Sequence, residues 1–197
     1  MAEKMDRRVR KTKAQLREGL ARLMQQKSIK EISVKELVDE VDINRSTFYL
    51  HYTDIYQMLQ KIEEDAMQNI TEVMKKYPIN SDNPDTVLQF IVQFFSIMDN
   101  DRDLCLALLG PHGDMAFVEQ IENLLAETFL KRLPEKLPKN DPNIKYPYAF
   151  ILQWLRSELN PLPWLFIVRL KESPDQVARM TYRFIEDTAQ GYLNMQK

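Results

Sequence analysis

Apolar residues recur at intervals of three and four along this chain, the spacing that places them on one face of an α-helix. Val34, Leu37, Val38 and Val41 show it most clearly. Only four glycines occur in 197 residues, and no competing strand pattern is found. The sequence therefore predicts an all-α protein.

Turn and capping residues divide this pattern into nine helices. Ser33 and Glu36 have the spacing of a capping box at the start of the second helix. Asn44 and Thr53 are the expected N-caps of the third and fourth helices. Pro161 and Pro163 must either kink or split the eighth helix, because proline lacks an amide donor. The predicted helices cover about residues 6–26, 34–41, 45–52, 54–76, 85–98, 102–109, 114–133, 148–171 and 174–195.

Charge is distributed unevenly. The whole chain has a net charge of −2, but residues 1–52 contain 12 Lys/Arg and 8 Asp/Glu, which leaves a net charge of −6 for the remainder. A basic segment joined to an acidic body is typical of a nucleic-acid-binding module. A solvated basic helix surface is the alternative on charge alone.

A short helix, a turn and a second short helix after a longer first helix form the helix-turn-helix pattern. At 100° per residue, Phe48 and Tyr52 share one side of the third helix and are expected in the core. Ser46 and Leu50 lie on the opposite side. The rings of this segment therefore divide between holding the helix in place and forming a surface for DNA.

The exposed side of the third helix has side chains suited to a major groove. Arg45 fits the O6 and N7 atoms of guanine, Ser46 can pair with several bases, and Leu50 can contact a thymine methyl group. Hydroxyl and imidazole donors near them fit phosphate oxygens, and the start of the second helix offers a second phosphate contact. The predicted DNA-binding residues are Ser33, Lys35, Asn44, Arg45, Ser46, Thr47, Tyr49, Leu50 and His51.

The stretch "EISVKELVDEVDINRSTFYLHYTDIYQML" resembles the TetR family of bacterial transcription regulators. The resemblance covers roughly residues 7–60 and is strongest at Thr47, Phe48, Tyr49, His51 and Tyr52. It implies base contacts from the residues at 45 and 46, with position 35 possible, and phosphate contacts from positions 33, 47, 49 and 51. The "DIYQML" variant looks like the branch that includes regulators of dihydroxyacetone kinase.

One position departs from the family pattern. Many members have a lysine where this chain has Ile55, so we expect a phosphate contact at the start of the fourth helix to be missing.

The resemblance also implies a two-domain, nine-helix architecture. Residues 1–53 would form the DNA-binding domain, and residues 54–197 would bind a small-molecule effector and form a homodimer. Ordinary core packing within one chain is the alternative for both residue sets. The candidate effector-pocket residues are Phe90, Phe94, Met98, Phe117, Phe150 and Trp154. The candidate dimer residues are Trp164, Val177, Met180, Phe184 and Thr188.

Other classes of protein are disfavoured. The sequence has no apolar stretch long enough to predict a membrane span. It has a single cysteine and no signal-peptide pattern, which favours the cytoplasm as its location. No metal-binding, catalytic or phosphate-loop motif is present, so we expect no enzyme, cofactor or metal. The predicted function is a regulator that binds a pseudo-palindromic DNA operator, by default a repressor released by its effector. The alternative is a TetR-fold co-activator or ligand-binding adaptor that acts through a protein partner.

Overall fold

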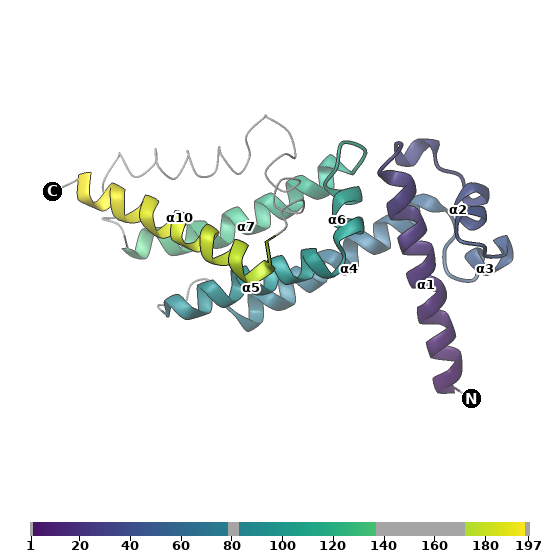
Figure 1. Ribbon diagram of the computed structural model, residues 1–197, viewed down its shortest axis with the longest axis horizontal. Coiled ribbons are helices and arrows are strands. Elements are labelled where there is room, and N and C mark those ends of the chain that lie inside the picture. Colours follow the sequence, from purple (N-terminus) through teal and green to yellow (C-terminus); the bar gives the residue numbers. More distant parts are fainter. Residues whose placement is uncertain (1, 79–82, 137–171, 196–197) are drawn as a thin grey trace. The chain divides into compact units, whose positions relative to one another are not determined.

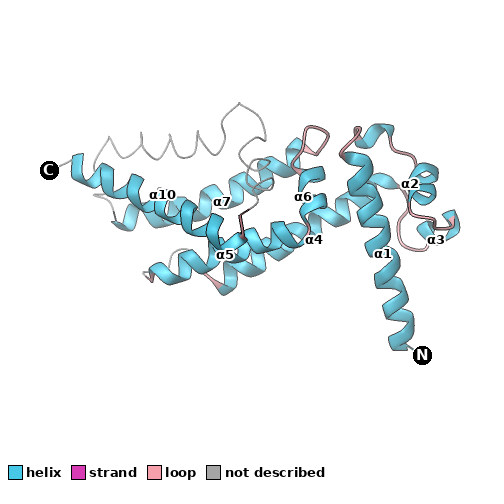
Figure 2. Cartoon of the chain, viewed as in Figure 1, coloured by secondary structure: helices cyan, strands magenta, loops and turns pink. Residues whose placement is uncertain are grey.

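A computed structural model describes residues 2–78, 83–136 and 172–195 of the chain (Figure 1). These residues form eight α-helices and one short 3-10 helix, and they contain no strand (Figure 2). The all-α prediction is confirmed. The predicted helix over residues 148–171, with Pro161 and Pro163, lies outside the described residues. The elements are α1 (Ala2–Met24), η1 (Ile29–Glu31), α2 (Val34–Glu40), α3 (Arg45–Tyr49), α4 (Ile55–Lys76), α5 (Pro84–Asn100), α6 (Arg102–Leu108), α7 (Met115–Lys136) and α10 (Pro174–Met195).

The predicted last residue of α3 and the predicted N-cap of α4 need correction. α3 ends at Tyr49 and not at Tyr52, because the amides of Leu50 and His51 bond to the carbonyls three residues earlier, at 3.3 and 2.9 Å. Such bonds tighten the last turn of a helix. Asp54, and not Thr53, caps α4, since its Oδ1 accepts the amide N–H of Gln57 at 2.8 Å.

The chain divides into two compact units. The first contains Met1–Met67 and Asp101–Phe117, and the second contains Gln68–Asn100 and Val118–Lys197. Helix α4 contributes its first part to one unit and its last part to the other. The first unit therefore includes α6 in addition to the helix-turn-helix segment.

Aliphatic and aromatic side chains from α1, α2, α3, α4 and α6 form the core of the first unit. They lie at the helical spacing seen in the sequence, and burial of each such side chain contributes about 1.5–3 kcal/mol. The most completely buried are Leu16, Leu20, Met24, Leu37, Phe48 and Met58.

Gly19 allows α1 and α2 to approach closely. A Cβ atom at this position would lie 2.2 Å from Cγ1 of Val41 and 3.2 Å from Cδ1 of Leu37. Valine is stiff about χ1, so its methyl group cannot turn away freely. Glycine is therefore needed here for packing, although it weakens the interior of a helix.

Polar contacts join α6 to α1. Arg17 forms an ion pair with Asp101, the N-cap residue of α6, and the side-chain amide of Gln25 donates to the carbonyl of Asp103 at 3.1 Å. Cys105 lies on α6, and burial, with a smaller effect of Asp101, raises the pKa of its thiol to about 12. Arg17 opposes that rise.

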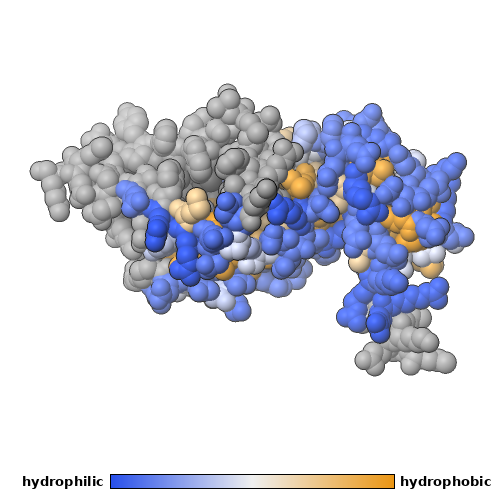
Figure 3. Space-filling model, viewed as in Figure 1, coloured by the Kyte–Doolittle hydropathy of each residue, from blue (hydrophilic) through white to orange (hydrophobic). Residues whose placement is uncertain are grey.

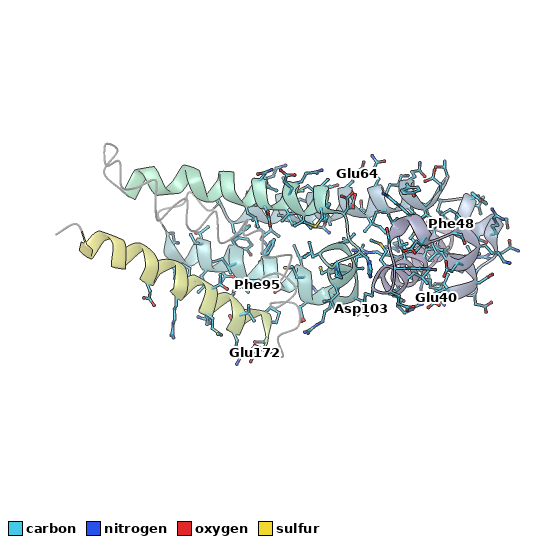
Figure 4. All side chains as sticks on the ribbon, turned by 90° about the horizontal axis from the view of Figure 1, so that it is seen from above. Glu40, Phe48, Glu64, Phe95, Asp103 and Glu172 are labelled. Atoms are coloured by element: carbon cyan, nitrogen blue, oxygen red, sulfur yellow. The ribbon has the colours of Figure 1, made fainter. Side chains whose placement is uncertain are left out.

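The second unit has an aromatic core on α5. The rings of Phe90 and Phe94 stack with centroids 6.1 Å apart, and Phe94 meets Phe95 edge to face at 5.8 Å; Figure 4 labels Phe95 on this helix. Helix α10 packs on α5, and its Val177 and Ala178 are buried. No helix within the described ranges has the length and apolar character needed to cross a membrane.

Glu63 of the first unit has surroundings that disfavour the ionised form of its carboxyl group. Its Oε1 atom is buried and meets no hydrogen-bond partner among the described residues. Burial, and secondly the charge of Asp114, raise the pKa of this carboxyl from 4.5 to about 7. The folded chain therefore binds a proton at Glu63 more tightly than the unfolded chain does.

Gly19→Ala should destabilise the protein. Overpacking lowers the free energy of unfolding by about 1–3 kcal/mol, and the better helix propensity of alanine offsets about 1 kcal/mol of this loss. Thermal unfolding should show a lower Tm for this variant. In a Val41→Ala background, where the obstructing methyl group is absent, the same substitution should cause no loss. An equal loss in both backgrounds would contradict the close approach.

Glu63→Gln should stabilise the protein increasingly as the pH rises. The unfolded carboxyl ionises above about pH 4.5 and the folded one only near pH 7, so the wild type loses stability across this interval. Because the group is partly exposed, solvent reduces the effect. We expect the Tm difference between the variant and the wild type to be larger at pH 8 than at pH 5. Glu64→Gln, at an exposed neighbour, is the matched control and should show no such trend.

Candidate nucleic-acid interface

A side-chain cap begins α2, and a residue in a left-handed conformation lies in the turn between α2 and α3. Ser33 caps α2, accepting the amide N–H of Glu36 at 3.2 Å. The reciprocal half of the predicted capping box is absent, because the carboxylate of Glu36 pairs with Lys27 instead. Asp42 has a φ of 52°, a left-handed conformation that aspartate tolerates better than most residues.

Two rings anchor α3, as the helical geometry predicted. Phe48 is fully buried and Tyr52 is 7% exposed, with ring centroids 5.7 Å apart. Figure 4 labels Phe48 among the helices of the first unit. These contacts fix which side of α3 faces solvent.

The opposite side of α3 presents large side chains to solvent. Tyr49 is 48% exposed and Leu50 is 79% exposed, while Arg45 and Ser46 are also exposed. We call these four residues the α3 face. This side of α3 is therefore open to contact with a partner.

Hydrogen bonds within the helix order the α3 face. Oδ1 of Asn44 accepts both the backbone N–H of Ser46 at 2.9 Å and its hydroxyl at 2.8 Å. Arg45 donates from Nε at 3.3 Å and from Nη2 at 3.1 Å to the hydroxyl oxygen of Tyr49. Its guanidinium carbon lies 5.6 Å from the centroid of the same ring. The predicted base-reading arginine is therefore bonded to the predicted phosphate-binding tyrosine.

The remaining predicted DNA-binding residues flank this face. Ser33 and Lys35 on α2 are exposed, and Thr47 and His51 are half-buried. Burial, and secondly the charge of Lys13 on α1, lower the pKa of His51 from 6.5. The neutral imidazole, which offers one N–H donor, is therefore favoured over the charged form more than in an unperturbed histidine.

The charge of Lys13 lowers the pKa of His51. The basic first part of α1 therefore acts electrostatically on the residues that follow α3. The residues of this basic run are exposed, and Figure 3 shows a hydrophilic surface along this end of α1. The charge run is evident in the sequence, but its effect on His51 is not. The members of the run are Arg7, Arg8, Arg10, Lys11 and Lys13.

Ile55 belongs to the core, with 4% of its surface exposed. The position where many family members have a lysine therefore offers nothing to a phosphate here.

The candidate effector and dimer residues have different surroundings. Phe90, Phe94 and Met98 are buried in the second unit, whereas Phe117 is buried in the first. Val177 has its apolar contacts within the chain, but Met180 on the same helix is 64% exposed. No group of three potential metal ligands occurs among the described residues. Phe150, Trp154 and Trp164, and the side chains of Phe184 and Thr188, lie outside what the structure describes.

Lys13→Gln should raise the pKa of His51, because it removes a nearby positive charge. The value should stay below 6.5, since burial is the larger cause and is unchanged. NMR titration of the imidazole protons measures it directly. Lys11→Gln, which removes an exposed lysine from the same helix, is the control. An unchanged His51 titration in the Lys13 variant would show that the two groups are not close in solution.

Comparison with known proteins finds transcriptional regulators. A family model of the TetR type, described as "Transcriptional regulator C-terminal region", matches residues 85–187, just over half of the chain. A curated relative, the "Uncharacterized HTH-type transcriptional regulator YxbF" of Bacillus subtilis, is 25% identical over 163 residues. That match covers 76% of this chain and 41% of the relative. The chain therefore spans about two fifths of that relative's length.

Solved structures support the same fold. A TetR transcriptional regulator from Streptococcus agalactiae matches with a TM-score of 0.57 and 22% identity, over 99% of this chain and 98% of its own. A TetR-family regulator from Bordetella parapertussis matches with a TM-score of 0.65 and 16% identity, over 93% and 96%. Together with the family model, these likenesses show that the chain belongs to the TetR family of transcriptional regulators.

Proposed function

We propose that this chain is a sequence-specific regulator that binds double-stranded DNA through α3. The observation that carries the proposal is the α3 face, where Tyr49 and Leu50 stand in solvent on a helix anchored from behind by Phe48. A helix presented in this way fits the major groove, where its N-terminal residues reach base edges.

The flanking residues supply the positioning contacts in this proposal. Thr47 and His51 donate to phosphates beside the groove, whereas Leu50 of the α3 face contacts a thymine methyl group. Ser33 and Lys35 contact the phosphate backbone from α2. Since Ile55 is buried, the start of α4 contributes no lysine contact.

The rest of the chain regulates this binding. We propose that residues 1–53 act as the DNA-binding domain and that residues 54–197 bind a small-molecule effector and form a homodimer. The exposed Met180 on α10 supports the dimer contact, to which the proposal also assigns Trp164, Phe184 and Thr188. Two copies of α3 would then reach half-sites of a pseudo-palindromic operator about 34–36 Å apart, or a multiple of that distance.

Regulation follows from differential binding. An effector that prefers the state unable to span the two half-sites lowers the affinity for DNA, so transcription repressed by the bound protein resumes. The protein acts in the cytoplasm and catalyses no reaction in this proposal.

Leu50→Ala should weaken binding to the operator about fivefold, as expected for the loss of one apolar base contact worth about 1 kcal/mol. Fluorescence anisotropy with DNA from upstream of the protein's own gene measures this. Binding of the wild type should weaken steeply with salt, because phosphate contacts release counterions. The salt slope of the variant should equal that of the wild type, since leucine carries no charge.

Met115→Ala is the matched control, because Met115 is an apolar residue of the first unit that is 59% exposed and belongs to α7, not to α3. It should bind the operator as the wild type does. If the wild type binds the upstream region no better than random DNA, the regulator proposal fails and the adaptor alternative takes its place.

A further inference from the structure

Two hydroxyl groups on the α3 face have their hydrogen-bonding direction fixed by neighbours within the same short segment. A free hydroxyl can donate or accept and therefore discriminates poorly between DNA groups. At Ser46 and Tyr49 that freedom is restricted, in opposite directions.

The hydroxyl of Ser46 is held as a donor to Asn44. The Asn44 atom it contacts must be the amide oxygen, because the backbone N–H of Ser46 also points to it and an N–H can only donate. The single hydroxyl hydrogen is thus used within the protein. What Ser46 presents outward is the lone pairs of an acceptor.

The hydroxyl of Tyr49 is held as an acceptor. Arg45 has no acceptor atom, so both of its contacts with the phenolic oxygen run from nitrogen to oxygen. The hydroxyl hydrogen of Tyr49 stays available, and the adjacent positive charge makes it a stronger donor. Phe48 meets the tyrosine ring edge to face at 5.5 Å, which limits its rotation.

The two directions match two different parts of DNA. Phosphate oxygens only accept hydrogen bonds, so they suit Tyr49. In the major groove the exocyclic amino groups, N6 of adenine and N4 of cytosine, are the base donors, so they suit Ser46. Guanine offers two acceptors there, which a hydroxyl committed as an acceptor cannot bind.

We infer that Ser46 determines operator specificity by accepting a hydrogen bond from the amino group of an adenine or a cytosine, and that Arg45 is a positioning residue which directs Tyr49 to a phosphate. This inference rests on the proposed function. It differs from the expectation that Arg45 reads a guanine, because Nε and Nη2 of that side chain are directed to Tyr49.

The first experiment uses an operator selected from random DNA with the wild-type protein. At each adenine or cytosine of a half-site, the base is replaced by an analogue that lacks the amino group, purine for adenine and 2-pyrimidinone for cytosine. At one position the wild type should lose about fivefold in affinity, the effect of one hydrogen bond. The analogue that causes the loss tells adenine from cytosine, and the same analogue at flanking positions is the control.

The Ser46→Ala variant should bind the natural operator with an affinity lower by the same factor. It should bind the analogue operator as the wild type does, because the variant and the analogue each remove the same hydrogen bond. The cap bond from the backbone N–H of residue 46 is retained in this variant, and unchanged thermal unfolding checks that it folds. The inference is overturned if no amino group couples to Ser46. It is also overturned if Ser46 couples to N7 of a purine, tested with 7-deaza bases, since that would make the hydroxyl a donor.

The second experiment compares Arg45→Ala, Tyr49→Phe and the double variant on a set of operators with single base-pair changes. Each should weaken binding by a similar factor on every operator, and the double variant should lose less than the product of the two single losses. If Arg45→Ala instead abolishes discrimination at one G·C pair and Tyr49→Phe does not, the arginine reads guanine and the positioning role fails.

The outcomes separate the two proposals. If no DNA is enriched by selection with the wild type, the DNA-binding function itself fails. If an operator is obtained but the analogues and variants behave otherwise than stated, that function stands and only the assigned hydrogen-bond directions fail.

Discussion

The packing of Phe48 is the interaction on which the rest of the candidate interface depends. A helix of five residues has no independent stability in water, because its few backbone hydrogen bonds do not offset the entropy of ordering the chain. The fully buried ring of Phe48, with Tyr52 beside it, supplies the missing energy. It also sets the rotation of α3, so the exposure of Tyr49 and Leu50 follows from it.

Sequence periodicity predicted this arrangement because burial and helical spacing are linked directly. A ring at Phe48 and another at Tyr52 can be placed on one side of a helix by counting residues. The end of α3 at Tyr49 was not predictable in this way, since it depends on which carbonyl oxygen accepts each amide N–H. The role of Gly19 was missed because its neighbour Val41 lies on another helix.

The polar contacts of the interface were harder still to foresee. Spacing of four residues allows Arg45 and Tyr49 to meet, but it does not show that they do so rather than point to solvent. Likewise Glu36 has the spacing to close a capping box, yet Lys27 competes for its carboxylate. In each case several partners of similar energy are available, and residue spacing does not determine which of them forms the contact.

The association of α6 with α1 also determines the reactivity of the chain's single cysteine. A thiol reacts with oxidants and electrophiles as the thiolate, and Cys105, with a pKa of about 12, holds almost none of that form at neutral pH. The half-buried thiol therefore stays protonated at neutral pH and reacts slowly. Because these 197 residues contain no second cysteine, no disulfide can form among them.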